Sequence, residues 1–128
     1  ETVQKCLSIF APMLSTMKVK KENMREAAGR GFINATDLAD YLTKKGMPFR
    51  SAYKIVGSIV AACIASGKTL ETLPMETYKG FSELFEDDLF DEISLDACVK
   101  KRISAGSTGP ASVAAQLSHV ENFIKSNQ

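Results

Sequence analysis

Apolar residues recur every three or four positions along most of this 128-residue sequence, and this spacing limits what the chain can fold into. Such spacing places side chains on one face of an α-helix. No window alternates between apolar and polar residues for long enough to predict a strand. The sequence therefore predicts an all-α fold: a small orthogonal bundle of six to seven helices, preceded by the end of a long bundle helix.

The first helical segment carries the clearest apolar stripe. Its members follow intervals of four, three, four and three, as in a coiled-coil seam, and they are Val3, Leu7, Phe10, Leu14 and Met17. Pro12 lacks an N–H and crowds the carbonyl of Ser8, so we expect a kink or a break there. The stripe packs either against this chain or in a larger bundle. The lack of a start signal before it favours the larger bundle, and a longer parent protein.

The remaining helices are predicted from apolar spacing and from residues that begin or end helices. One covers about 21–28 and ends at Gly29 and Gly31, and the next opens at Asn34 or Thr36, either of which can cap it. The others are expected from Pro48 to Gly67, at 75–84, at 85–91 as a short turn, after a Ser94 cap, and from 110 to Ile124.

Within these helices, the spacing also predicts which side chains face inward. The expected inward residues are Leu38, Tyr41, Leu42, Ala52, Ile55, Val56, Ile59, Val60, Cys63, Tyr78, Phe81, Val99 and Ile103. Gly57 lies in mid-helix, where glycine costs up to about 1 kcal/mol relative to alanine. A close crossing with another helix would explain a glycine there.

Charge and composition argue against several classes of partner. Sixteen basic and fifteen acidic residues leave a net charge of +1, which is not that of a strongly basic nucleic-acid-binding chain. No apolar run approaches the roughly 18 residues that a membrane span needs. The first residues resemble no signal peptide. We therefore expect no nucleic-acid or membrane partner, and a cytoplasmic protein.

The groups that most often carry chemistry do not form a recognisable site. His119 is the single histidine, and no serine, cysteine or carboxylate lies at a spacing that indicates a catalytic site. We therefore interpret it as a solvent-facing helical side chain. Cys6, Cys63 and Cys98 are too far apart for a disulfide framework, which fits a reducing cytosol. They fall on or beside apolar faces and are expected to be buried thiols. One histidine without a cysteine pair offers little for zinc.

Three short charged or glycine-containing segments have ordinary explanations. The acidic stretch 86–92 lacks the pattern of a calcium-binding loop and is interpreted as a solvated turn. The basic residues 100–102 suit the negative end of a helix. The loop 106–109 lacks phosphate-loop spacing and is at most a weak anion site. The sequence therefore predicts no catalytic, cofactor-binding or metal-binding residue.

One stretch is more specific. The run ATDLADYL at 35–42, followed by KGMPFR at 45–50 and IVG at 55–57, closely resembles the C-terminal region of argininosuccinate lyases. Shorter matches lie upstream of this run, at 22–25 and 31–32, and downstream in the family's order, at 85–88 and 106–110. The resemblance covers nearly the whole chain. This chain departs from it at Tyr53, where the family often has histidine, and at Ser107, where the family usually has a second glycine.

The resemblance implies a specific parent enzyme of the fumarase–aspartase superfamily. Argininosuccinate lyases cleave argininosuccinate to arginine and fumarate without a cofactor or metal. They form homotetramers around a bundle of long helices, and each active site is assembled from three chains. The serine-bearing signature loop and the catalytic histidine of the family are not found in this sequence, so no catalytic residue is carried over.

By the same resemblance, residues 1–18 are the end of a central-bundle helix and residues 19–128 are a C-terminal helical domain. We expect this chain to be structural and inactive by itself, and expect copies of it to associate through the stripe at Val3, Leu7, Phe10, Leu14 and Met17. The alternative is a free-standing helical interaction module that docks through the face from Phe10 to Met17.

Overall fold

The computed structural model describes residues 1–127, and these contain eight helices and no strand. The all-α prediction is confirmed. The helices are α1 (Thr2–Ser15), α2 (Lys21–Ala28), α3 (Ala35–Lys44), α4 (Phe49–Ser66), α5 (Met75–Phe81), α6 (Leu89–Ile93), α7 (Leu95–Lys100) and α8 (Pro110–Ser126).

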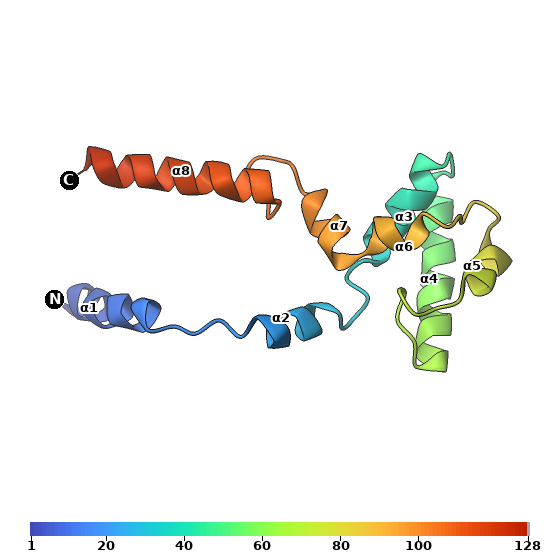
Figure 1. Cartoon of the computed structure of the whole chain (residues 1–128), viewed down its shortest axis with the longest axis horizontal. Coiled ribbons are helices and arrows are strands. Elements are labelled where there is room, and N and C mark those ends of the chain that lie inside the picture. The colour runs from blue at the N-terminus through green and yellow to red at the C-terminus, as the bar shows by residue number, and fades with distance from the viewer. Residues whose placement is uncertain (128) are drawn as a thin grey trace.

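The molecule consists of a packed core and two arms. Helices α3 to α7 gather into the core, while α1 and α8 extend from the same side of it (Figure 1). Because α1 runs toward the core and α8 runs away from it, the two arms are antiparallel and both chain ends lie at their far tips (Figure 1). We refer to α1 and α8 below as the two arms.

Helix α3 lies at the centre of the core, where it packs against α4 and α6. The inner face of α4 follows helical spacing, with Ala52, Val56, Ile59 and Cys63 all buried. Tyr78 is fully buried and meets the edge of the Phe85 ring, with 5.1 Å between ring centroids. Its hydroxyl donates a hydrogen bond of 2.6 Å to the Leu70 carbonyl, which satisfies the polar atom within the core.

Several predicted helix ends are confirmed. Gly67 follows α4 in the left-handed conformation, with φ of 65°, a region that glycine enters without steric cost. The Ser94 hydroxyl accepts a hydrogen bond of 3.2 Å from the Ala97 N–H and so caps α7. Gly29 differs, because its φ is −73° and the left-handed residue lies two positions later, at Gly31.

At Pro12 one of the two predicted alternatives, a break, is excluded, and the prediction of a side-chain cap on α3 is wrong. Helix α1 continues through Pro12, whose carbonyl still accepts a hydrogen bond of 3.1 Å from the Thr16 N–H, so there is no break. Asn34 precedes α3 but its side chain caps nothing. Its amide nitrogen instead donates to the Glu71 carboxylate at 2.9 Å and to the Ile93 carbonyl at 3.0 Å. A buried tertiary contact therefore takes the place of a local cap.

The boundaries and inward faces near α5 to α7 also differ from the prediction. Helix α5 ends at Phe81 instead of residue 84, and the short turn expected at 85–91 is helix α6 at Leu89–Ile93. Phe81 and Val99 are exposed, and Ile103, at 82% exposure, faces solvent. The spacing within each helix predicted that these three side chains face inward, but no other part of the core covers them.

Two expectations about α4 are corrected. Gly57 is exposed, and a Cβ atom added there would meet nothing within 4 Å, so no close crossing within the described residues explains it. Helix α4 has 18 residues and a mean hydropathy of 1.2, long and apolar enough by length and composition to cross a membrane, contrary to the sequence analysis. Its buried face forms the middle of the core, and we interpret it as a core helix.

Candidate functional site

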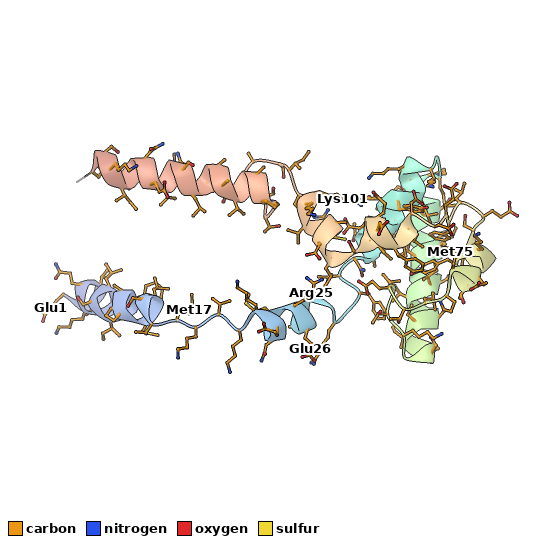
Figure 2. The ribbon with its side chains drawn as sticks, viewed as in Figure 1. Glu1, Met17, Arg25, Glu26, Met75 and Lys101 are labelled. Carbon is orange, nitrogen blue, oxygen red and sulfur yellow. The ribbon has the colours of Figure 1, made fainter. Side chains whose placement is uncertain are left out.

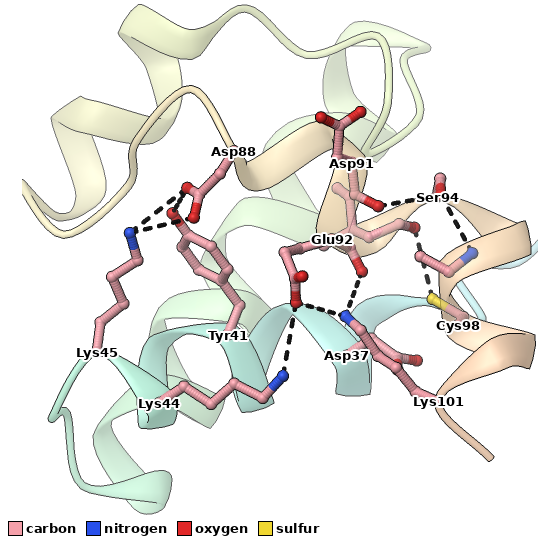
Figure 3. A network of polar contacts seen from close by, with 12 residues as sticks. Asp37, Tyr41, Lys44, Lys45, Asp88, Asp91, Glu92, Ser94, Cys98 and Lys101 are labelled. Atoms are coloured by element: carbon pink, nitrogen blue, oxygen red, sulfur yellow. Dashed lines mark hydrogen bonds and ion pairs between the residues drawn. The ribbon is translucent and has the colours of Figure 1, made fainter. Parts of the chain in front are cut away.

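Charged and polar side chains form neighbouring groups of contacts, together called the network below, where α3 meets α6 and α7 (Figure 3). The basic residues come from the end of α3 and from just after α7, while the acidic ones come from the 86–92 segment. The acidic segment was expected to be a solvated turn. The structure corrects this interpretation, because Glu86, Asp88 and Glu92 all pair with lysines of other segments.

One half of the network surrounds Tyr41. Its hydroxyl donates a hydrogen bond of 2.5 Å to Asp88 and accepts one of 3.1 Å from the Glu86 N–H. The Lys45 ammonium lies 2.5 Å from the Glu86 carboxylate, 3.4 Å from Asp88 and 4.9 Å from the centre of the Tyr41 ring. The hydrogen bond from Tyr41 and the charge of Lys45 hold the pKa of Asp88 below its ordinary value.

The other half is centred on Glu92. The Lys101 ammonium donates to the Glu92 carboxylate and to its backbone carbonyl, both at 2.6 Å, and Lys44 lies 3.5 Å from the same carboxylate (Figure 3). These contacts, led by the Lys101 hydrogen bond, lower the pKa of Glu92. Glu92 therefore joins the end of α3 to the end of α7.

Asp37 is the buried member of the network. Its side chain is 2% exposed, and both carboxylate oxygens accept hydrogen bonds from Arg102, at 3.0 and 2.8 Å. A bidentate pair of this kind is among the stronger polar contacts in proteins. Beside it, burial is the main cause that raises the pKa of the Cys98 thiol to about 11, with Asp37 adding to the effect. The basic residues 100–102 were assigned to the helix dipole. Lys101 and Arg102 instead make tertiary ion pairs.

The loop before α8 is used for packing. The Ser107 hydroxyl donates a hydrogen bond of 2.5 Å to the Arg102 carbonyl, and Gln116 donates one of 3.0 Å to the Ser107 carbonyl. Gly109 approaches so closely that an added Cβ would lie 2.0 Å from the Arg102 oxygen. This loop is therefore a tight connection that sets where α8 leaves the core.

This arrangement is suited to bracing helices, because the carboxylates of Glu86, Asp88 and Glu92 face cations or hydroxyl donors from other segments. Within residues 1–127, no group of three histidine, cysteine or acidic side chains could hold a metal ion. His119 is exposed, as expected. Cys63 and Cys98 are buried free thiols, whereas Cys6, also expected to be buried, is exposed.

The second functional feature is the apolar surface of the arms. Four of the five stripe residues lie on α1 and Met17 follows its end; all five are between 51% and 71% exposed, and no residue of α1 is buried. Their side chains project into open space between the labelled Glu1 and Met17 (Figure 2). Helix α8 has an exposed stripe at Val113, Leu117, Val120 and Ile124. The apolar spacing of residues 110–124 indicated this helix, but sequence analysis assigned no surface role to it.

Comparisons with known proteins agree with the division of the chain into a core and two arms. A family model described as argininosuccinate lyase C-terminal matches residues 32–100, which comprise the core helices α3 to α7 and leave out both arms. The chain is 51% identical over 128 residues to the argininosuccinate lyase of Clostridium beijerinckii, covering 100% of this chain and 28% of that protein.

Two further relatives give the same result. The argininosuccinate lyase of Acetivibrio thermocellus is 50% identical over 98% of the chain, and that of Alkaliphilus metalliredigens is 44% identical over 98%. The chain spans 27% of the length of each of these two relatives. The similarity includes the arms as well as the core. This chain belongs to the argininosuccinate lyase family and corresponds to its C-terminal part.

Proposed function

We propose that this chain is the C-terminal region of an enzyme that cleaves argininosuccinate to arginine and fumarate in arginine biosynthesis. The observation that carries the proposal is identity of about one half over essentially the whole chain to proteins named argininosuccinate lyase. In this proposal the parent enzyme acts as a cytoplasmic homotetramer and needs no cofactor or metal.

The role proposed for this region is structural. Residues 1–18 continue a bundle helix of the parent, and residues 19–128 form a C-terminal helical domain. The ion pairs of Lys45, Glu92 and Arg102 hold that domain together, and they leave no free acid–base pair among themselves. The exposed stripe on α1 supports association with another copy, because exposing such side chains forfeits about 1.5–3 kcal/mol each relative to burial.

The test is an exchange of regions. The matching C-terminal part of the Clostridium beijerinckii enzyme is replaced by this chain, and fumarate release is followed by ultraviolet absorbance. We expect the chimera to turn over argininosuccinate and the 128-residue chain alone to give no signal above buffer. The matched control carries Arg102→Ala in the same chimera and should lose thermal stability.

Two results would count against the proposal. The first is a chimera that folds and assembles like the donor enzyme and yet releases no fumarate. The second is turnover by the isolated chain in a preparation free of the full-length enzyme, which would show that the active site lies within these residues.

A further inference from the structure

Helix α4 has an apolar outer face that nothing in residues 1–127 covers. The buried residues on its inner side make up only 22% of the helix. On the outer side Phe49 is 50% exposed, and Tyr53 and Ile64 are each 66% exposed. Helix α4 lies on the side of the core away from the two arms, which extend in the other direction (Figure 1). The outer face of α4 is therefore separate from the stripes on the arms.

This outer face contains one row of residues spaced four apart. The row is uncharged and all its members are exposed: Phe49, Tyr53, Gly57, Ala61 and Ala65. Rows of this spacing are the ones through which helices most often pack against each other. The first two members are aromatic, and the last three have no side chain larger than a methyl group. The second half of the row therefore leaves room for the backbone of another helix.

Gly57, in the middle of the row, favours a helix as the partner. Glycine inside a helix lowers stability relative to alanine. Nothing in the described residues offsets this loss, because a Cβ atom added at Gly57 would meet no atom within 4 Å. Glycine is favoured where another backbone approaches closely. A close crossing would explain Gly57, and the crossing segment lies outside residues 1–127.

Two cations at the start of α4 indicate the charge of that segment. Arg50 and Lys54 lie one turn apart, next in sequence to the two aromatic residues of the row, and both are exposed. Neither makes an ion pair within residues 1–127, and α4 contains no acidic residue. A second copy of α4 would bring two further cations and no carboxylate. A helix that carries acidic side chains would instead complement Arg50 and Lys54.

We propose that a helix from the part of the parent enzyme outside this chain crosses α4 at Gly57. Its apolar side chains cover the row, and its acidic side chains face Arg50 and Lys54. This inference rests on the proposed function, in which the chain is the C-terminal region of a longer lyase. The chain spans 28% of the Clostridium beijerinckii relative, so most of a parent of that length lies outside it and is available to supply the helix.

Labelling of a thiol on the row tests the contact, in the isolated chain and in the chimera with the Clostridium beijerinckii enzyme. The probe is Ala61→Cys with Cys6→Ser, since Cys63 and Cys98 are buried, and serine replaces the cysteines of the donor part. We expect the probe to react rapidly in the isolated chain and roughly tenfold more slowly in the chimera, because the crossing helix excludes the reagent. The matched control, Gly80→Cys at an open glycine of α5, should react equally fast in both.

Two further changes should remove the protection of the probe. Gly57→Leu puts a bulky side chain at the crossing point, and Arg50→Gln with Lys54→Gln removes the two cations. Each should return the labelling rate of the chimera to that of the isolated chain, whose own rate should not change. Lys79→Gln with Lys100→Gln removes the same charge from two other exposed lysines and should leave the probe protected.

The possible results separate this contact from the proposed function. A chimera that releases fumarate but labels as fast as the isolated chain would overturn the contact and leave the proposed function standing. In a chimera that assembles without turnover the proposed function fails, and protection of the probe still supports the contact. Slow labelling already in the isolated chain, with a disulfide between two copies of the probe, would show that a second copy covers the row and would overturn the parent helix. Protection that survives the loss of Arg50 and Lys54 would overturn the acidic partner.

Discussion

The Arg102 guanidinium donates two hydrogen bonds to the Asp37 carboxylate, at 3.0 and 2.8 Å, across 65 positions of sequence. Asp37 lies in the first turn of α3, and Arg102 follows α7 directly. The pair therefore joins the centre of the core to the segment that leads into α8. Since the carboxylate is 2% exposed, Arg102 is the group that allows its charge to be buried.

Removing the cation should therefore destabilise the fold. Breaking a fully buried pair from one side costs about 3–5 kcal/mol. Arg102 is 43% exposed, and solvent screening lowers the expectation for Arg102→Ala to about 2 kcal/mol. Urea unfolding measures the change. Arg25→Ala, which breaks the exposed pair with Asp96, is the control and should change stability little. Equal losses in the two variants would contradict the special role of Arg102.

Two glycine-to-alanine substitutions should change the stability of the fold in opposite directions. Gly109→Ala places a Cβ 2.0 Å from the Arg102 carbonyl oxygen, a backbone atom that cannot turn aside, so we expect a loss of about 1–3 kcal/mol. Gly57→Ala adds a methyl group to an open helical position and should raise stability by up to about 1 kcal/mol. Thermal unfolding of both variants checks the signs. A stabilised Gly109→Ala would mean that the loop before α8 is not tightly packed.

Stability should fall at acidic pH. The pKa of Glu92 is lowered from its ordinary value of 4.5, mainly by the Lys101 hydrogen bond, and the pKa of Asp88 is lowered from 3.8, mainly by Tyr41. A carboxylate with a lowered folded pKa stabilises the fold fully above its unfolded pKa, and this contribution is lost as the pH falls through the folded one. We expect the urea midpoint to decrease below about pH 4.5.

A matched pair of variants tests whether Glu92 contributes to the loss of stability at acidic pH. Glu92→Gln cannot titrate, so its urea midpoint should start lower at neutral pH and decrease less on acidification. Glu83→Gln removes an exposed carboxylate from the same region and should keep the pH profile of the parent. If the Glu92→Gln profile coincides with that of the parent, the Lys101 contact does not contribute to the dependence.

How far the sequence predicted this fold depends on whether the deciding contact is local. Helix α2 was predicted at its observed bounds, and α4 ends at the glycine expected, because spacing and end residues lie within one helix. Asn34 and Arg102 were assigned to a cap and a dipole, and both instead bind residues distant in sequence. The opposite charges of 86–92 and 100–102 were a signal for the Lys101–Glu92 pair, but nothing in the spacing links Arg102 to Asp37.

The three cysteines should react in sequence with a thiol reagent. Cys6 is exposed on α1, whereas Cys63 and Cys98 are buried, and burial raises the pKa of the Cys98 thiol to about 11. The thiolate is the reactive form, so the native chain at neutral pH should label once, rapidly, and the other two thiols should follow only on unfolding. Cys6→Ser should abolish the fast phase. A fast phase that survives this substitution would place a second thiol at the surface.

The α1 stripe should be dispensable for the core but required for association. Phe10→Asp with Leu14→Asp puts two charges on the stripe, and no residue of α1 is buried in the core. We therefore expect the unfolding transition of α3 to α7 to stay near that of the parent, while sedimentation changes from dimer to monomer. Ser8→Asp with Ser15→Asp adds the same charge to the outer side of α1 and should leave the dimer intact. Global unfolding of the Phe10 and Leu14 variant would show instead that α1 packs into the core of its own chain. That result would contradict the exposed position of α1 and the self-association proposed from its stripe.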